Sequence, residues 1–207
     1  MSDSAATSPG RRPFLPYVLL GVASMASAEF QANVLLRGNV VTFAMALGMY
    51  AVLTAVAWLI GRRAAAGRAD LRFHVLGGLF GMLVIEWFLA GFHPGSGKGG
   101  IQAAMFTNWA AVFTVPRLFT SERTAENDRV RRAVARTIVV YSVAAPLLVV
   151  ALPVPRGPAV GILMSVYSIV LAFRCVPFLV ASPRARTRLR WIDAALAAAA
   201  AVNVLWW

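Results

Sequence analysis

An ionisable side chain, Glu86, lies within the long apolar segment GMLVIEWFLAGF, residues 81–92. If this segment crosses a bilayer, the carboxylate costs about 2.5–3.5 kcal/mol or more, so it needs a polar partner or a path to water. On a helix over residues 73–92, Glu86 is about four turns from one end and about two from the other. A short Glu side chain at that depth does not reach the interface easily. Glu86 therefore predicts a binding or proton-transfer site, or a polar contact between helices.

Further polar residues fall at a similar depth if the neighbouring apolar segments are helices that cross in alternating directions. Together with Glu86, the predicted binding site comprises Glu29, Arg37, His93, Gln102, Asn108 and Asn203. Two hypotheses follow for Glu86. In the first, the carboxylate pairs with Arg37 or an amide and fixes the bundle. In the second, it is the titratable member of a site that opens outward.

The spacing around Glu86 predicts which side chains share its helix face. His93 is seven residues further on, so a regular α-helix places it on the same face as Glu86. Gly77 and Gly81 form a small-xxx-small pair on roughly the opposite face. Such a pair allows close helix approach, so we expect it to contact one neighbouring helix while Glu86 faces another.

Other chemistry is disfavoured by residue type or spacing. The GSGK at 95–98 has Phe92 where a phosphate-binding loop needs its first glycine. His74 and His93 would be about 28 Å apart on one helix, so they cannot hold one haem, and we expect His74 to be solvated at the interface. With Cys175 as the single cysteine, no His/Cys metal cluster is expected, and no Gly-x-Ser-x-Gly motif is present. We therefore expect no metal and no cofactor.

Composition indicates a membrane protein. Apolar residues make up 59% of the 207 residues and the mean hydropathy is +0.71, whereas soluble domains are about 45–50% apolar. The net charge of +12 would suggest nucleic acid in a soluble protein, but no nucleic-acid partner is expected here. We predict a disordered cytoplasmic N-terminus at 1–12 and one all-α transmembrane domain at 13–207. Its seven predicted helices are 13–31, 39–60, 73–92, 101–119, 136–154, 158–180 and 191–207.

The distribution of basic residues predicts the orientation. Alternate connections collect sixteen of the 20 basic residues on one side of the bundle and three on the other. Cytoplasmic loops are enriched in Lys and Arg, so this partition predicts a cytoplasmic N-terminus and an external C-terminus. All basic residues except Lys98 are arginine, which favours a high-GC bacterial genome and a multi-pass protein of the bacterial inner membrane.

The cytoplasmic Arg loops are expected to contact anionic lipid headgroups. Residues 121–136 predict a short charged helix leading into the fifth span, with an i,i+4 pair between Asp128 and Arg132. Arg174 lies about two turns from the basic side, close enough for its side chain to extend to the interface.

The first span has an alternative interpretation. Residues 11–28 carry a basic start, a short apolar stretch and an Ala-Ser-Ala ending, which resembles a cleavable signal peptide with cleavage after Ala28. Cleavage would leave six helices. A retained first span is favoured, because the segments that follow are themselves membrane-embedded.

Three function classes remain after these exclusions. The outward polar cluster favours a carrier or proton-coupled transporter of a small solute. The small size and the lack of an extramembrane domain fit the alternative, a non-catalytic subunit or assembly factor that binds other membrane subunits. An intramembrane enzyme ranks third, because no nucleophile–base pair or metal set is visible in the sequence.

Overall fold

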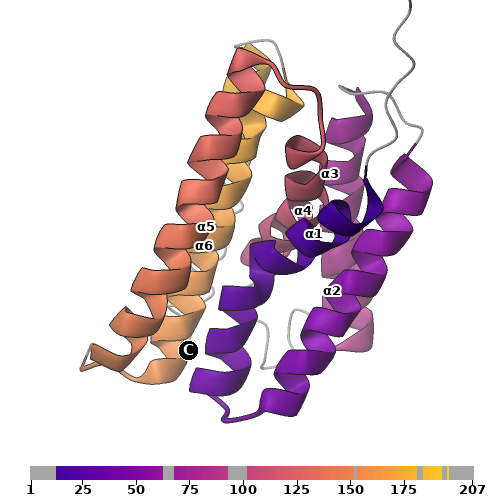
Figure 1. The fold of residues 1–207 in the computed structure, drawn as a ribbon. Coiled ribbons are helices and arrows are strands. Elements are labelled where there is room, and N and C mark those ends of the chain that lie inside the picture. The colour runs from indigo at the N-terminus through magenta and orange to yellow at the C-terminus, as the bar shows by residue number, and fades with distance from the viewer. Residues whose placement is uncertain are drawn as a thin grey trace, which may run out of the picture.

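The chain folds into a bundle of long helices (Figure 1). The structure is a computed structural model that describes residues 13–62, 68–92, 102–151, 153–180, 184–192 and 195, and no strand occurs among them. The principal elements are α1 (Phe14–Glu29) with the π-helix η1 (Phe30–Leu35), α2 (Val40–Gly61), α3 (Arg68–Phe80) with the π-helix η2 (Gly81–Leu89), α4 (Gln102–Phe119), α5 (Ala125–Ala151) and α6 (Arg156–Leu179).

Five continuous helices are long and apolar enough to cross a membrane: Phe14–Leu35, Val40–Gly61, Ala69–Leu89, Ala125–Ala151 and Arg156–Leu179. The predicted all-α architecture with several membrane-spanning helices is confirmed at this level. Helix boundaries differ from the prediction where charged residues begin a helix. α3 begins at Arg68, before the predicted start at residue 73, whereas the charged helix predicted within residues 121–136 is continuous with the fifth span in α5, which begins at Ala125.

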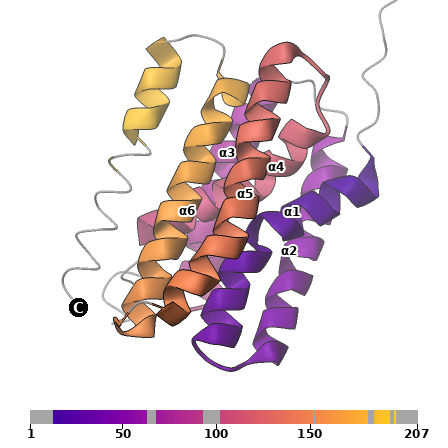
Figure 2. The same cartoon turned by 60° about the vertical axis from the view of Figure 1, so that its left-hand side comes forward.

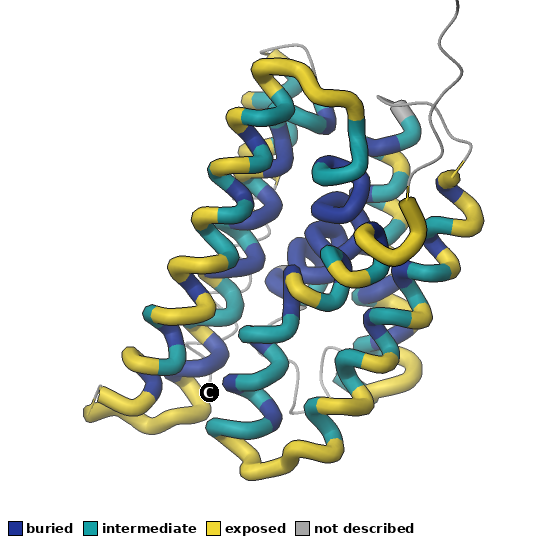
Figure 3. The backbone as a smooth tube through the Cα atoms, in the orientation of Figure 1, coloured by how far each residue is buried: buried dark blue, intermediate teal, exposed yellow. Residues whose placement is uncertain are grey.

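α4 is the central helix of the bundle and contacts α1, α3 and α6. With the exception of Met105, every residue from 104 to 118 is buried, as the dark blue segment in Figure 3 shows. α4 is not one of the five strongly apolar helices, because polar side chains such as Thr107, Asn108 and Arg117 lower its hydropathy. A helix enclosed by other helices needs no lipid-facing apolar surface, so its composition fits its position.

The described arginines gather mostly at one end of the bundle, here called the basic end. The start of α1, the end of α2, the start of α3, the α4–α5 turn and the end of α6 all lie there (Figure 1). The α1–α2 and α5–α6 turns lie at the opposite end and carry Arg37 and Arg156. The helices therefore alternate in direction as the charge pattern predicts.

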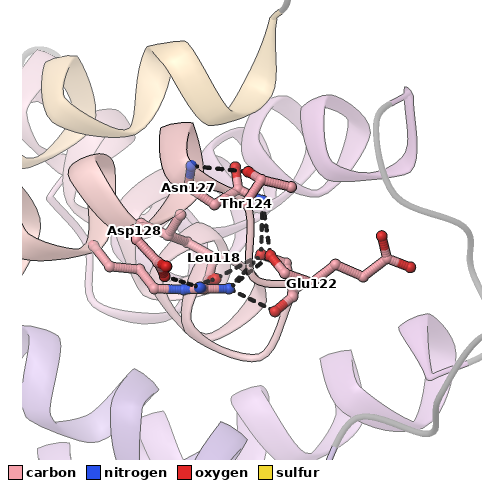
Figure 4. A network of polar contacts seen from close by, with 7 residues as sticks. Leu118, Glu122, Thr124, Asn127 and Asp128 are labelled. Atoms are coloured by element: carbon pink, nitrogen blue, oxygen red, sulfur yellow. Dashed lines mark hydrogen bonds and ion pairs between the residues drawn. The ribbon is translucent and has the colours of Figure 1, made fainter.

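Arg131 fixes the turn between α4 and α5 (Figure 4). Its Nε donates to the Leu118 carbonyl at 3.0 Å and its Nη2 to the Ser121 carbonyl at 2.5 Å, while its Nη1 bonds Asp128 at 2.6 Å. These contacts satisfy carbonyls at the end of α4 that have no partner within the helix. The predicted pair between Asp128 and Arg132 is therefore wrong: Asp128 pairs at i,i+3 with Arg131, which also gains the carbonyl acceptors.

A further helix covers residues 184–192 (Figure 2), so it begins seven residues before the predicted seventh helix, in a stretch predicted to be a loop. Arg186 joins this helix to the end of α6 and to α5. Its Nε donates to the Val180 carbonyl at 2.6 Å, and its Nη2 donates to Glu126 Oε1 at 2.5 Å. Most of the predicted seventh span, residues 193–194 and 196–207, lies outside the described residues.

The α3–α4 interface is polar near the basic end. Arg117 Nε donates to Asp70 Oδ1 at 2.5 Å with both side chains buried, and the guanidinium also lies 4.3 Å from the centre of the Phe73 ring. One turn further along α3, His74 Nδ1 lies 2.9 Å from Thr114 Oγ1. His74 is completely buried, so the expectation that it is solvated at the interface is wrong. The earlier start of α3 places it a turn and a half inside the helix.

Candidate functional site

Two π-helices shape the half of the bundle away from the basic end. In η1 and η2 the backbone bonds skip one residue more than in an α-helix, as in Leu36 N to the Gln31 carbonyl at 3.0 Å and Ala90 N to the Ile85 carbonyl at 2.9 Å. Glu29 directly precedes η1, and Glu86 lies inside η2. π-helical segments are rare and occur frequently at functional sites, so both half-buried acids stand at unusual backbone positions.

The π-helix turns Glu86 toward α4. In a π-helix residues i and i+5 lie above one another, so Gly81 and Glu86 share a face. Both meet the same side chain: a Cβ on Gly81 would lie 1.9 Å from Trp109 Cγ, and Trp109 Nε1 donates to Glu86 Oε1 at 2.9 Å. Gly77 also packs on α4, against Phe113. The expectation that the glycine pair and Glu86 face different helices is therefore wrong.

Glu29 is held by donors from its own segment and from α2. It accepts a hydrogen bond from the Tyr50 hydroxyl at 2.6 Å and one from Asn33 Nδ2 at 2.8 Å. Asn33 Oδ1 in turn accepts from Arg37 Nη1 at 3.4 Å, and Arg37 acts electrostatically on Glu29. Charge-assisted bonds of this kind offset part of the cost of placing a carboxylate away from water.

The surroundings of the two acids form one polar cluster. The Glu29 and Glu86 carboxylates are close enough to interact electrostatically. The Tyr50 ring packs against Trp109 with 5.0 Å between centroids, so the hydrogen-bond donor of each acid touches that of the other. On the α6 side, Ser168 Oγ donates to Asn108 Oδ1 at 3.2 Å. The cluster thus joins α1, α2, η2, α4 and α6.

A cavity of about 290 Å³ opens onto this cluster. Its volume is near the lower limit of the roughly 300–1,000 Å³ typical of small-molecule sites. Polar lining comes from both carboxylates and from amide, hydroxyl and guanidinium groups, and the remainder is apolar. The lining residues are Glu29, Ala32, Asn33, Leu36, Arg37, Glu86, Phe92, Ala104, Met105, Asn108, Gly157, Val160, Gly161, Met164 and Ser168.

Four of the seven predicted site residues line this one cavity: Glu29, Arg37, Glu86 and Asn108. Gln102 is the first residue of α4, and its side chain lies outside the described part of the structure, as do His93 and Asn203 entirely. η2 ends at Leu89, so the helix face predicted to carry both Glu86 and His93 does not extend to His93.

Glu86 bonds Trp109, not the predicted Arg37 or an amide. In the part of the chain that the structure describes, no ion pair joins Glu86 to Arg37, and the carboxylate bonds the Trp109 indole instead of a guanidinium or an amide. Arg37 contacts Asn33, on the Glu29 side of the cavity. The indole N–H satisfies one oxygen of the acid as a neutral donor, whereas the guanidinium of Arg37, which also lines the cavity, bonds Asn33.

Sequence reasoning missed Tyr50, Trp109 and Ser168. A signal for Tyr50 exists, because the buried positions of α2 repeat at Tyr50, Thr54, Ala57 and Gly61, a stripe of polar and small residues on an otherwise apolar helix. Trp109 carries no such periodic signal. Trp109 meets Glu86 only because the π-helix changes the direction in which Glu86 points, and α-helical periodicity does not predict that change.

The cluster can bind a small polar or cationic group and can hold a proton. Within the described ranges, no group of three or more His, Cys, Asp and Glu side chains is arranged to hold a metal ion. The cavity offers acceptors in Glu29, Glu86 and Asn108, and a hydroxyl in Ser168. No protein family matches the chain, and comparison with curated proteins and with solved structures finds no match.

Proposed function

We propose that the chain is a carrier or proton-coupled transporter of a small solute, with Glu86 and Glu29 in its binding site. The observation that carries this proposal is the cavity of about 290 Å³ that both carboxylates line at the same depth in the bundle. The hollows along α5–α6 and α2–α3 are larger, but neither has a described acidic residue in its lining, so the two carboxylates distinguish this cavity. Ionisable residues that face a cavity inside a membrane protein typically mark the path of a substrate or a proton.

The charges of the cluster indicate what it would bind. Two carboxylates in one low-dielectric site repel each other, and either a proton or a cationic group placed between them relieves that repulsion. Arg37 interacts with Glu29, so Glu86 is the acid that depends more on such a ligand. A solute amine that competes with protons for Glu86 would couple its binding to the proton gradient.

The proposal includes an orientation. The cavity lies toward the end opposite the basic end, and the positive-inside rule places the basic end in the cytoplasm. The site would then open outward. α4 would be a further span, and residues 191–207 would supply the seventh, with the N-terminus inside and the C-terminus outside. The protein would be a multi-pass protein of the bacterial plasma membrane.

Aqueous access to the cavity tests the first part of this proposal. Met164→Cys places a thiol in the cavity lining, and Ile162→Cys places one on the exposed face of the same helix. Both are made in a Cys175→Ala background, in which the native buried thiol is absent. A membrane-impermeant maleimide added outside should label Met164→Cys and spare Ile162→Cys. Equal, slow labelling of both would contradict an outward aqueous site.

Solute binding tests the second part. Purified protein is screened for thermal stabilisation by small amines, amino acids, carboxylates and sugars at several pH values. We expect a stabilising solute whose effect is lost in Glu86→Gln and kept in the matched variant Glu122→Gln, an exposed acid in the α4–α5 turn. Glu86→Gln keeps an oxygen that can accept from Trp109, so its own stability should change by less than about 1 kcal/mol. A solute effect that persists in Glu86→Gln would remove Glu86 from the site.

A further inference from the structure

A second, larger hollow runs along the outside of the bundle between α5 and α6. This groove has a volume of about 600 Å³ and is lined by two kinds of side chain. At the basic end it carries four arginines: Arg129, Arg132, Arg136 and Arg174. Further along, apart from Thr137 and the two tyrosines, it is aliphatic: Ala133, Val140, Ala144, Ala145, Leu148, Leu163, Val166 and Val170. None of the described residues that line it is acidic.

The four arginines are available to bind an anion. All four are exposed, and in the described structure none of them forms an ion pair or a hydrogen bond, in contrast to Arg131 and Arg186 nearby. They come from two helices and border the same groove. Four guanidinium groups that border one groove without an ion-pair partner among the described residues favour a negatively charged ligand, and guanidinium geometry suits phosphate.

The apolar part of the groove continues from the arginines into the depth of the bilayer. From Arg136 to Leu148 the helix rises about 18 Å, slightly more than half of the roughly 30 Å hydrocarbon thickness. Two aromatic rings widen this apolar lining: Tyr141 and Tyr167 stack across the α5–α6 interface with 3.9 Å between centroids and an interplanar angle of 13°. A ligand that fills the groove therefore has an anionic head and an apolar chain about one leaflet long.

A groove between α2 and α3 provides an internal comparison. It has a volume of about 410 Å³ and a lining that is also largely apolar, and among its described lining residues Arg72 alone is charged. Any membrane helix pair can present an apolar groove to lipid. The concentration of four unpaired arginines at the head of one groove distinguishes the α5–α6 site.

We propose that the α5–α6 groove is a binding site for an anionic phospholipid of the leaflet at the basic end. Its phosphate lies among Arg132, Arg136 and Arg174, and one acyl chain lies along Val140, Ala144 and Leu148. This site is separate from the cavity at Glu86 and does not depend on the proposed carrier function. A phospholipid is favoured over free phosphate because the groove supplies an apolar surface below the charges.

Lipid retention measured by native mass spectrometry tests the proposal. The full chain is purified from vesicles of equimolar dioleoylphosphatidylglycerol and dioleoylphosphatidylcholine, and the lipids that remain bound are counted. Arg136→Gln combined with Arg174→Gln removes two charges from the groove. The control, Arg123→Gln combined with Arg188→Gln, removes two exposed charges from the basic end outside the groove. Ala144→Trp fills the apolar part and leaves all arginines in place.

We expect phosphatidylglycerol to be enriched on the wild type and on the control. The groove variant should bind it about tenfold to thirtyfold more weakly, and Ala144→Trp should also lose it. Equal retention by the groove variant and the control would overturn the site. If inorganic phosphate displaced the lipid fully and Ala144→Trp had no effect, the arginines would be a phosphate site rather than a lipid site. If lipid retention changed when a second copy bound or when residues 193–207 were removed, we would conclude that protein rather than lipid occupies the groove.

Discussion

Removal of Asp70 should destabilise the bundle more than removal of any acid at its surface. Asp70 and Arg117 are both buried, with 2.5 Å between Oδ1 and Nε. At that separation and an effective dielectric constant of about 20, the gross attraction is about 7 kcal/mol. Much of it offsets the desolvation of the two charges. Loss of one partner leaves the other buried without its main counter-charge, which typically costs about 3–5 kcal/mol.

Asp128 offers a matched control for this prediction. Both acids lie in the first turn of a helix, so both gain similarly from the helix dipole. The Asp128 side chain is 38% exposed, and its pair with Arg131 should contribute no more than about 1 kcal/mol. Asp70→Asn should therefore lower the free energy of unfolding by about 3–5 kcal/mol, and Asp128→Asn by less than about 1 kcal/mol.

The assay is unfolding by sodium dodecyl sulfate in mixed micelles, followed by tryptophan fluorescence and far-UV circular dichroism. Asp70→Leu combined with Arg117→Met removes both charges, and it should recover most of the stability lost in Asp70→Asn, because no buried charge is left behind. The reasoning fails if Asp70→Asn is as stable as Asp128→Asn. It also fails if the double variant is less stable than Asp70→Asn alone.

Three further predictions concern packing and topology. Gly81→Ala should destabilise the bundle by at least about 1–3 kcal/mol, since its Cβ would overlap Trp109, whereas Gly48→Ala, at an open helix position, should be neutral or stabilising in the same unfolding assay. Reporter fusions at positions 66, 96, 126 and 186 should read inside, outside, inside and inside; an external signal at 126 would break the predicted topology at α4. Intact mass of the purified protein should show α1 retained, and a mature chain that starts at Glu29 would refute this.

Much of the fold follows from the sequence because hydropathy and charge act over whole segments. The apolar stretches predict helices, and the arginine clusters predict which helix ends lie together, so errors in boundaries of a few residues do not change the arrangement. The boundary moved most at α3, which begins at Arg68 and includes charged positions that are polar enough to look like a loop. One of them, Asp70, pairs with Arg117 of α4.

The candidate site was predictable in depth but not in partners. Depth depends only on the number of residues from a helix end, and four residues selected in this way, Glu29, Arg37, Glu86 and Asn108, line one cavity. Partners depend on the rotation of each helix about its axis. Two π-helical segments change that rotation just where the acids lie, so α-helical periodicity gave the wrong face for Glu86. No residue pattern in η2 signals the change.

The central position of α4 has a consequence for how the protein is made. A helix with Asn108, Thr114 and Arg117 in its interior or last turn is a poor substrate for one-at-a-time release from the translocon into lipid, where an arginine alone costs about 2.5–3.5 kcal/mol. If α4 spans the membrane as proposed, it would depend there on α3, which supplies Asp70, and on α6, which is synthesised later. α4 would then have to stay at the insertion machinery or against α3 until α6 emerges, and biogenesis of the protein would depend on the order and timing of helix release.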